Sequence, residues 1–257
     1  MKYAWMVIGL ILLTSGLFAQ EAGDDVAQLL VKGDEYFDAF DNAKALESYL
    51  AAYNADNTNC EALWKITRTY ADLGEVAEKD EQAKLYEKAE SFGRKAIATC
   101  PDDGNAHLQL AIAVGRVAVM AGGKTKVKLS KEVKAEALKA LELDPTLDGA
   151  HHVLGRWHRG VANLSGLLKM FAKVLYGGLP PASNEDAVKH FKKAIELKPE
   201  HINHHLELGI TYEMMKEWAN AKASYEKVLE LPVSDADDDA HKREAKERLK
   251  KVEKKLK

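Results

Sequence analysis

The chain has 257 residues and a formal net charge of −3, with 46% apolar and 30% charged residues. This composition is typical of a folded globular protein, and the near-neutral charge balance argues against a nucleic-acid-binding protein. With only 6 Pro and 17 Gly, the chain is not a low-complexity or disordered sequence.

The first 19 residues differ from the rest of the chain. One lysine is followed by an uncharged run from Tyr3 to Ala19, with the small residues Ser15 and Gly16 near its end. This layout is typical of a secretory signal peptide, and the run is short for a membrane span, which needs about 20 apolar residues. We therefore predict a signal peptide at 1–19 and an exported, periplasmic protein, with a retained N-terminal membrane anchor as the alternative.

Residues 20–257 carry an internal repeat of helix pairs. The clearest unit starts at Ile202 and has Leu208, Gly209, Tyr212, Ala221 and Tyr225 at relative positions 7, 8, 11, 20 and 24. That is the 34-residue tetratricopeptide (TPR) pattern of two antiparallel helices. Another unit near the N-terminus repeats four of these positions, with Gly33, Tyr36, Ala45 and Tyr49.

Three longer units lie between these two and end at Pro101, Pro145 and Pro199, because proline cannot continue a helix. The step from Pro101 to Pro145 is 44 residues and the next is 54, so we place the extra residues between the two helices of each unit. The predicted units are 26–59, 60–103, 104–147, 148–201 and 202–234. No unit can bury its apolar face alone, so we predict an all-α TPR solenoid of about five helix pairs with an enlarged fourth unit.

The two cysteines open and close the second unit. Without the ten extra residues of this unit, Cys60 and Cys100 correspond to positions 1 and 31 of the 34-residue pattern, and antiparallel helices bring the start of the first helix near the end of the second. A disulfide bridge and two unpaired buried thiols are the alternatives that the sequence leaves open.

The enlarged fourth unit contains an apolar insert at 161–179. Its apolar residues recur at steps of three and four, as on one face of a helix: Leu164, Leu167, Leu168, Phe171, Leu175 and Tyr176. We expect this insert to extend the first helix of the unit or to pack back on the solenoid. A lid over a groove, or an apolar surface for a lipid or a partner helix, is the alternative.

The C-terminal segment 235–257 is predicted to be a solvating cap helix. It opens with Asp235, Asp237, Asp238 and Asp239 and closes with five lysines. Acidic residues at the start and basic residues at the end of a helix complement its dipole.

The enlarged unit also resembles a known family. The start LGRW, the apolar insert, the Y-G-G-L-P segment at Tyr176–Pro180 and the helix EDAVKHFKKAIELKP are similar to the core of the regulator of microtubule dynamics family, as are KGDEYFDAFDNAKALESY and LWKITRTYADLG nearer the N-terminus. The resemblance implies a TPR-like domain and partners among microtubules and membranes, and one relative binds phospholipid through its repeat domain. The export signal departs from the family, so microtubules are a partner by resemblance only.

The inner face of such a solenoid is lined by the first helix of each unit. Reading its inward positions along the chain places four arginines and a histidine on this face of an acidic protein. The predicted groove residues are Trp64, Arg68, Asn105, Arg116, His152, Arg156, Arg159 and Asn203. Guanidinium groups suit carboxylates and phosphates. The alternative is that the arginines pair with acids such as Asp34, Asp38, Glu61 and Glu213.

Catalytic and metal chemistry find little support in the sequence. His201 and His205 have the spacing of a metal pair on a helix, but His107, His151 and His205 share relative position 4 of their units, where a packing ring explains all three. AVMAGGKT at 118–125 lacks the first glycine and the preceding strand of a phosphate loop. We expect no metal and no cofactor.

The sequence therefore predicts a non-enzymatic TPR scaffold that binds an anionic peptide or protein partner, one with an acidic or carboxylate group, in a basic concave groove. The alternative is a phospholipid-binding or lipid-transfer module that uses the apolar insert 161–179.

Overall fold

A computed structural model describes residues 25–257, so the predicted signal peptide 1–19 lies outside the described residues. Across the part of the chain that is described, all regular structure is helical, which confirms the predicted all-α class. No helix in this part is long and apolar enough to cross a membrane. The helices are 25–38, α2 (Asn42–Ala55), α3 (Cys60–Val76), α4 (Lys79–Thr99), α5 (Gly104–Met120), α6 (Gly123–Leu143), α7 (Asp148–Ala162), α8 (Gly166–Tyr176), α9 (Asn184–Leu197), α10 (Ile202–Met214), α11 (Trp218–Glu230) and α12 (Asp238–Leu256).

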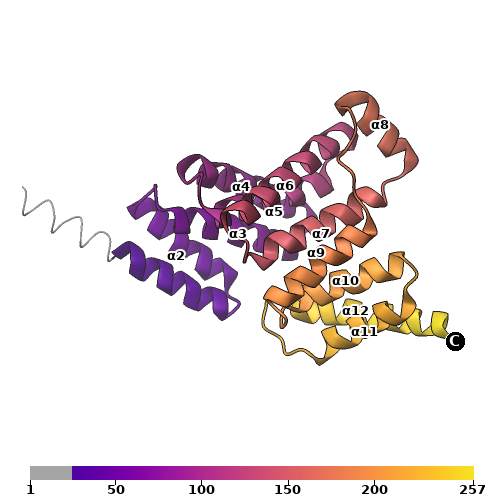
Figure 1. The fold of residues 1–257 in the computed structure, drawn as a ribbon. Coiled ribbons are helices and arrows are strands. Elements are labelled where there is room, and N and C mark those ends of the chain that lie inside the picture. The colour runs from indigo at the N-terminus through magenta and orange to yellow at the C-terminus, as the bar shows by residue number, and fades with distance from the viewer. Residues whose placement is uncertain (1–24) are drawn as a thin grey trace, which may run out of the picture.

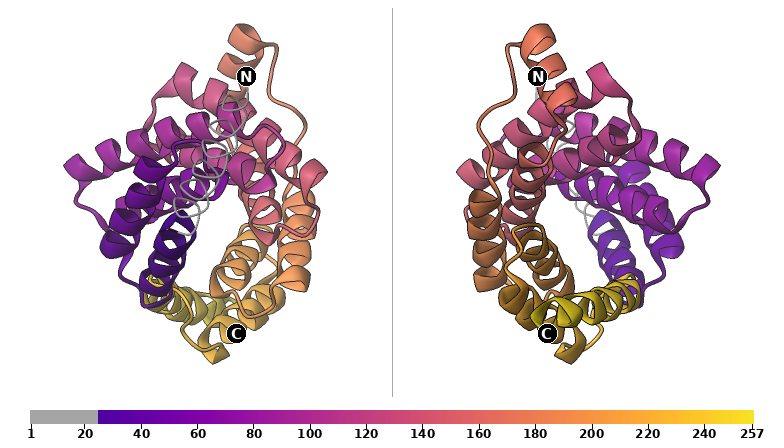
Figure 2. Two further views of the ribbon diagram at one scale, coloured as in Figure 1. Left: turned by 90° about the vertical axis from the view of Figure 1, so that its left-hand side faces the viewer. Right: turned by 90° about the vertical axis from the view of Figure 1, so that its right-hand side faces the viewer.

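The helices pack as successive antiparallel pairs. Within the units, α3 packs against α4, α5 against α6, α7 against α9, and α10 against α11, and each pair stacks on the next. Figure 1 shows these pairs from the N-terminal end in indigo to the C-terminal end in yellow. The views in Figure 2 show that the stack curves, so that the first helices of the units turn inward. The predicted TPR solenoid is therefore confirmed.

The helix ends follow the sequence signals. Helices α4, α6 and α9 each end two residues before a proline, at Thr99, Leu143 and Leu197. At the other end, Asn59 and Asp103 accept backbone N–H groups of the first turns of α3 and α5 through their side-chain oxygens. These contacts satisfy donors that a helix start leaves without partners.

The two helices of a unit approach closely because a glycine faces an aromatic ring. A Cβ atom on Gly155 of α7 would lie 2.7 Å from the Phe191 ring of α9, and one on Gly209 of α10 would lie 2.5 Å from the Tyr225 ring of α11. Both rings are fully buried. This interlock fixes the rotation of each first helix and therefore which of its residues face inward.

The apolar insert does not continue α7. The chain breaks at Asn163, and Ser165 accepts the N–H of Leu168 to start the separate helix α8. Helix α8 contacts α6 but projects from the solenoid (Figure 1). It ends at Gly177 in a left-handed conformation, φ 68°. The side chains of Phe171, Leu175 and Tyr176, three members of the predicted stripe, lie outside what is described.

Helix α12 is the predicted cap. It packs against α11 and α10, with Ala245 and Val252 buried in the contact. Its first turn is acidic and its last turn carries Lys254 and Lys255, as the dipole argument requires.

A disulfide joins Cys60, the first residue of α3, to Cys100, directly after α4. The two Cα atoms are 6.0 Å apart and the cysteines are 40 residues apart in the chain. Of the two alternatives that the sequence left open, the structure has the bridge. It ties together the outer ends of the second helix pair.

We expect reduction of this bridge to destabilise the protein, because it releases a long loop in the unfolded chain. The expected loss is about 3–4 kcal/mol in the free energy of unfolding. Urea unfolding of the oxidised protein and of the Cys60→Ser, Cys100→Ser double variant measures it. Equal stability of the two proteins would contradict the prediction.

Candidate functional site

The predicted groove residues all lie on the first helices of their units. These positions are Trp64 and Arg68 on α3, Asn105 and Arg116 on α5, His152, Arg156 and Arg159 on α7, and Asn203 on α10. Three of the four arginines contact a carboxylate from the first helix of a neighbouring unit, and the fourth contacts an aromatic ring of the first helix of the chain. The register read from the sequence therefore brings the arginines to a shared face, but it does not leave them all free.

Glu207 of α10 pairs with two arginines of α7. Arg159 donates to its Oε2 and, at 2.9 Å, to its backbone oxygen. The Nε of Arg156 lies 3.4 Å from Oε1. Burial acts to raise the pKa of Glu207, but the two arginines outweigh it and hold that pKa below its usual value. Glu207 is therefore ionised at neutral pH, and the guanidinium of Arg159 is occupied by its ion pair with this carboxylate.

Arg116 of α5 pairs with Glu75 of α3. Burial lowers the pKa of Arg116 to about 10, and the nearby charge of Arg156 adds to this lowering. The guanidinium remains protonated at neutral pH. Burial also raises the pKa of Asp72, one turn before Glu75, to about 7, while Arg68 and Arg116 act in the opposite direction. Asp72 is thus partly protonated at neutral pH.

Arg68 is held by aromatic rings. Its guanidinium carbon lies 3.6 Å from the centroid of the Phe37 ring and 5.4 Å from that of Trp64. Its buried Nε has no hydrogen-bond partner among the described residues. Arg68 therefore combines a cation–π contact with an unused donor.

The connection between α11 and α12 adds two more acids to this region. The negative charges of Asp235 and Asp237 raise the pKa of Asp72. The charge of Asp237 also acts to raise the pKa of Arg116. Four guanidinium groups are therefore matched by five carboxyl groups, those of Asp72, Glu75, Glu207, Asp235 and Asp237. Acidic groups therefore accompany the arginines on the inner face, and the electropositive character of the groove stays a prediction.

His152, a predicted groove residue, is in contact with another histidine. Its Nδ1 lies 2.9 Å from Nδ1 of His204, whose Nε2 lies 2.8 Å from Asp148. Burial lowers the pKa of His152 far below its usual value, and the charges of His204 and Arg156 add to this. The ring is neutral and contributes no positive charge to the groove.

The acids that the sequence offered as partners for the arginines have other contacts. Asp34 and Glu61 both pair with Lys65 at 2.6 Å. Glu213 accepts from Tyr225 and pairs with Arg248 at 3.0 Å. Asp38 is exposed. The acids that do pair with the arginines, Glu75 and Glu207, were not identified from the sequence. A glutamate inside an otherwise apolar run, as at Glu207, was a sequence signal for a buried ion pair.

The remaining predicted groove residues carry no charge. Trp64, Asn105 and Asn203 are partly buried, and neither asparagine side chain has a hydrogen bond among the described residues. The histidines at relative position 4 pack as predicted: His107 and His205 lie 2.9 and 2.7 Å from the carbonyl oxygens of Pro101 and Pro199. The ring of His205 is therefore hydrogen-bonded to the chain that ends the preceding unit.

Comparison with known proteins places these features in a family. The family model for regulator of microtubule dynamics protein 1-3 matches residues 29–253. Regulator of microtubule dynamics protein 1 of Caenorhabditis elegans is 28% identical over 218 residues, which cover 85% of this chain and 96% of that protein. Regulator of microtubule dynamics protein 3 of Rattus norvegicus is 31% identical over 183 residues, 68% of this chain but only 38% of that protein.

Among solved structures, a thermophilic TPR protein of Thermus thermophilus is similar with a TM-score of 0.63 and 20% identity. The match covers 86% of this chain and 98% of that one. At this identity the likeness concerns the fold alone.

Two partly buried histidines predict a loss of stability in mild acid. Burial lowers the pKa of His190 to about 4 and that of His201 to about 3. Between these values and the unfolded value near 6.5, the unfolded chain binds more protons than the folded one. The stability is therefore complete above about pH 6.5 and falls as the pH drops toward 4.

Urea unfolding at pH 7 and pH 5 tests this with the variant His190→Gln. We expect the wild-type chain to lose about 1–2 kcal/mol more than the variant between these two pH values. The same loss in both proteins would show that His190 does not titrate as its burial requires.

Proposed function

Because this chain belongs to the regulator of microtubule dynamics family, we propose that it is a non-enzymatic scaffold that binds an anionic segment of a partner protein on its inner face. Family membership and the TPR fold support a scaffold or protein-binding role. The identity of the bound group rests on the inner face itself. Microtubules remain a partner by family resemblance, since the relatives carry that name.

Arg156 is the observation that carries the proposal. Its side chain is 39% exposed, and its ion pair with Glu207 is long, with Nε at 3.4 Å from Oε1. Within the described chain its two terminal nitrogens have no other hydrogen bond or ion pair. A carboxylate or a phosphate can therefore accept two parallel N–H bonds from this guanidinium.

The contact of Arg156 is also the one that a ligand displaces most easily. The Nε of Arg156 stands 3.4 Å from the carboxylate and its side chain is 39% exposed, while Arg159 keeps Glu207 neutralised after the exchange. Arg68, with its unused Nε, supplies a further cation on the same face. We therefore assign recognition to Arg156 and Arg68, and a structural role to Arg116 and Arg159.

A phospholipid is the second candidate ligand, and helix α8 favours it. Leu167, Met170 and Val174 are 59%, 53% and 76% exposed, and they recur at helical spacing. Lys169 and Lys173 are exposed beside them. An apolar stripe flanked by lysines suits the surface of an anionic membrane.

We also propose that the chain works outside the cytoplasm. The disulfide between Cys60 and Cys100 supports this location, because such bridges persist in oxidising compartments. The uncharged run from Tyr3 to Ala19 supports export as well.

The proposal predicts that Arg156→Gln weakens binding of a fluorescent hexaglutamate peptide at least about tenfold, because one charge-assisted bidentate contact is lost. Arg94→Gln is the matched control, since Arg94 is a 45% exposed, ion-paired arginine of the second helix α4. Its affinity should stay within about twofold of the wild type. Fluorescence anisotropy at low salt measures both.

Equal affinity of the Arg156 and Arg94 variants would contradict the peptide proposal. Cosedimentation with vesicles of phosphatidylglycerol and phosphatidylcholine distinguishes the lipid candidate. Binding to these vesicles that is lost in Val174→Ser and kept in Arg156→Gln would favour the lipid candidate over the peptide.

A further inference from the structure

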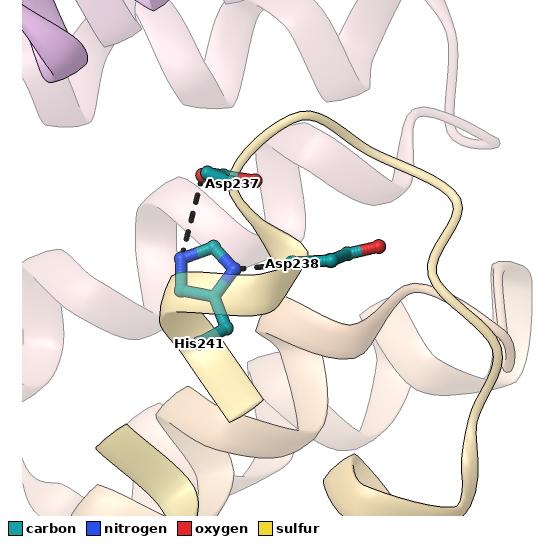
Figure 3. A group of neighbouring side chains, drawn as sticks. All are labelled: Asp237, Asp238 and His241. Atoms are coloured by element: carbon teal, nitrogen blue, oxygen red, sulfur yellow. Dashed lines mark ion pairs between the residues drawn. The ribbon is translucent and has the colours of Figure 1, made fainter. Parts of the chain in front are cut away.

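Two aspartates and a histidine come together at the start of α12. Figure 3 shows Asp237, Asp238 and His241, with one aspartate next to each nitrogen of the imidazole ring. One nitrogen or oxygen atom from each of the three side chains lies within 4.8 Å of the others. The spacing of three and four residues along the helix brings them onto one face.

The carboxylate of Asp238 is buried, and only one of its oxygens is satisfied. Its side chain is 1% exposed. Oδ2 accepts the backbone N–H groups of Ser234 and Asp235 at 2.8 and 2.9 Å, which holds the connection from α11 in place. Oδ1 is fully buried and has no hydrogen-bond partner among the described residues. A buried carboxylate oxygen without a partner is costly, so it calls for a ligand.

His241 faces this oxygen with a nitrogen in the same condition. Its Nδ1 is buried without a hydrogen-bond partner in the described chain. It lies 3.8 Å from Oδ1 of Asp238, which is too long for a hydrogen bond. On the other side of the ring, Nε2 lies 3.4 Å from Oδ2 of Asp237, a side chain that is 31% exposed. The cluster is therefore buried on one side and open to solvent on the other.

We propose that Asp237, Asp238 and His241 form a binding site for a divalent transition-metal cation of the Zn²⁺ class. Such ions bind imidazole nitrogen and carboxylate oxygen at about 2.0–2.2 Å. An ion between Nδ1 of His241 and Oδ1 of Asp238 spans their 3.8 Å separation with bonds of that length, and it satisfies both atoms that now lack a partner. Asp237 lies beside Nε2 of the same ring, where its carboxylate orients the imidazole so that Nδ1 faces the ion. Ca²⁺ is a poorer fit, because it takes six to eight oxygen ligands.

The site has a structural consequence for the cap helix. Ser234, Asp235 and Asp238 already form a hydrogen-bonded turn between α11 and α12. A bound cation fixes the first turn of α12 to this connection. It also adds positive charge near His241, whose own charge acts to lower the pKa of Glu207. This inference does not depend on the partner proposed above.

Zn²⁺ alone is the probe. The tag-free chain, treated with a chelator and desalted, is titrated with ZnCl₂ by calorimetry, and the complex is weighed by native mass spectrometry. We expect one tight equivalent of Zn²⁺. Asp237→Asn and His241→Asn each should weaken this binding at least about tenfold. Asp239→Asn, which removes the same charge from the same helical turn outside the cluster, should change it by less than about twofold.

The far-ultraviolet circular dichroism of each variant without metal checks that the fold is retained. The proposal is overturned if the wild-type chain binds no equivalent of Zn²⁺. It is also overturned if His241→Asn binds Zn²⁺ as tightly as the wild type, because the metal then sits at other surface histidines. In either case the Asp238–His241 contact is a local structural pair only.

Discussion

The carboxylate of Glu207 lies between the guanidinium groups of Arg156 and Arg159, and this pairing determines what the inner face can do. It joins the first helix of the fourth unit to that of the fifth through a buried charge cluster. A buried carboxylate is tolerated only with such partners. Arg159 contacts both the carboxylate and the backbone oxygen of Glu207, whereas Arg156 reaches the carboxylate at 3.4 Å, which is why we propose Arg156 as the residue that binds an anion.

The backbone that presents these charges is set by packing between helices. A glycine of each first helix in the fourth and fifth units accommodates a buried ring, Phe191 or Tyr225, from the second helix. This contact sets the rotation of α7 and α10, and hence the inward direction of Arg156, Arg159 and Glu207. The same interlock recurs between Gly33 and Tyr49 in the first unit. Packing and electrostatics thus act on the same helices.

The sequence predicted the fold because its signals are local. Glycine, alanine and aromatic residues recur at fixed spacing, and prolines follow the helix ends, so helix pairs and their order could be read directly. The positions of the arginines followed from the same register. Helix α8 was harder, because an apolar helical stripe does not tell whether the helix packs inward or projects.

The charge of the inner face could not be predicted, because it depends on contacts between units. The acids that pair with the arginines, Glu75 and Glu207, lie on the first helices of neighbouring units. Two further acids, Asp235 and Asp237, lie in the connection to α12, which the curved stack brings near Asp72. His152 was counted with the cations, although burial lowers its pKa far below the usual value and the charge of His204, 52 residues away, adds to this lowering. A register assigns a residue to a face but does not identify what lies opposite.

A double-mutant cycle on Arg159 and Glu207 tests the central claim most directly. The free energies of unfolding of Arg159→Ala, Glu207→Ala and the double variant are compared with that of the wild type. The account predicts a coupling of about 1–3 kcal/mol between the two sites, as for residues in one buried network. Additive effects, with a coupling below about 0.3 kcal/mol, would contradict the buried ion pair on which the inner face is built.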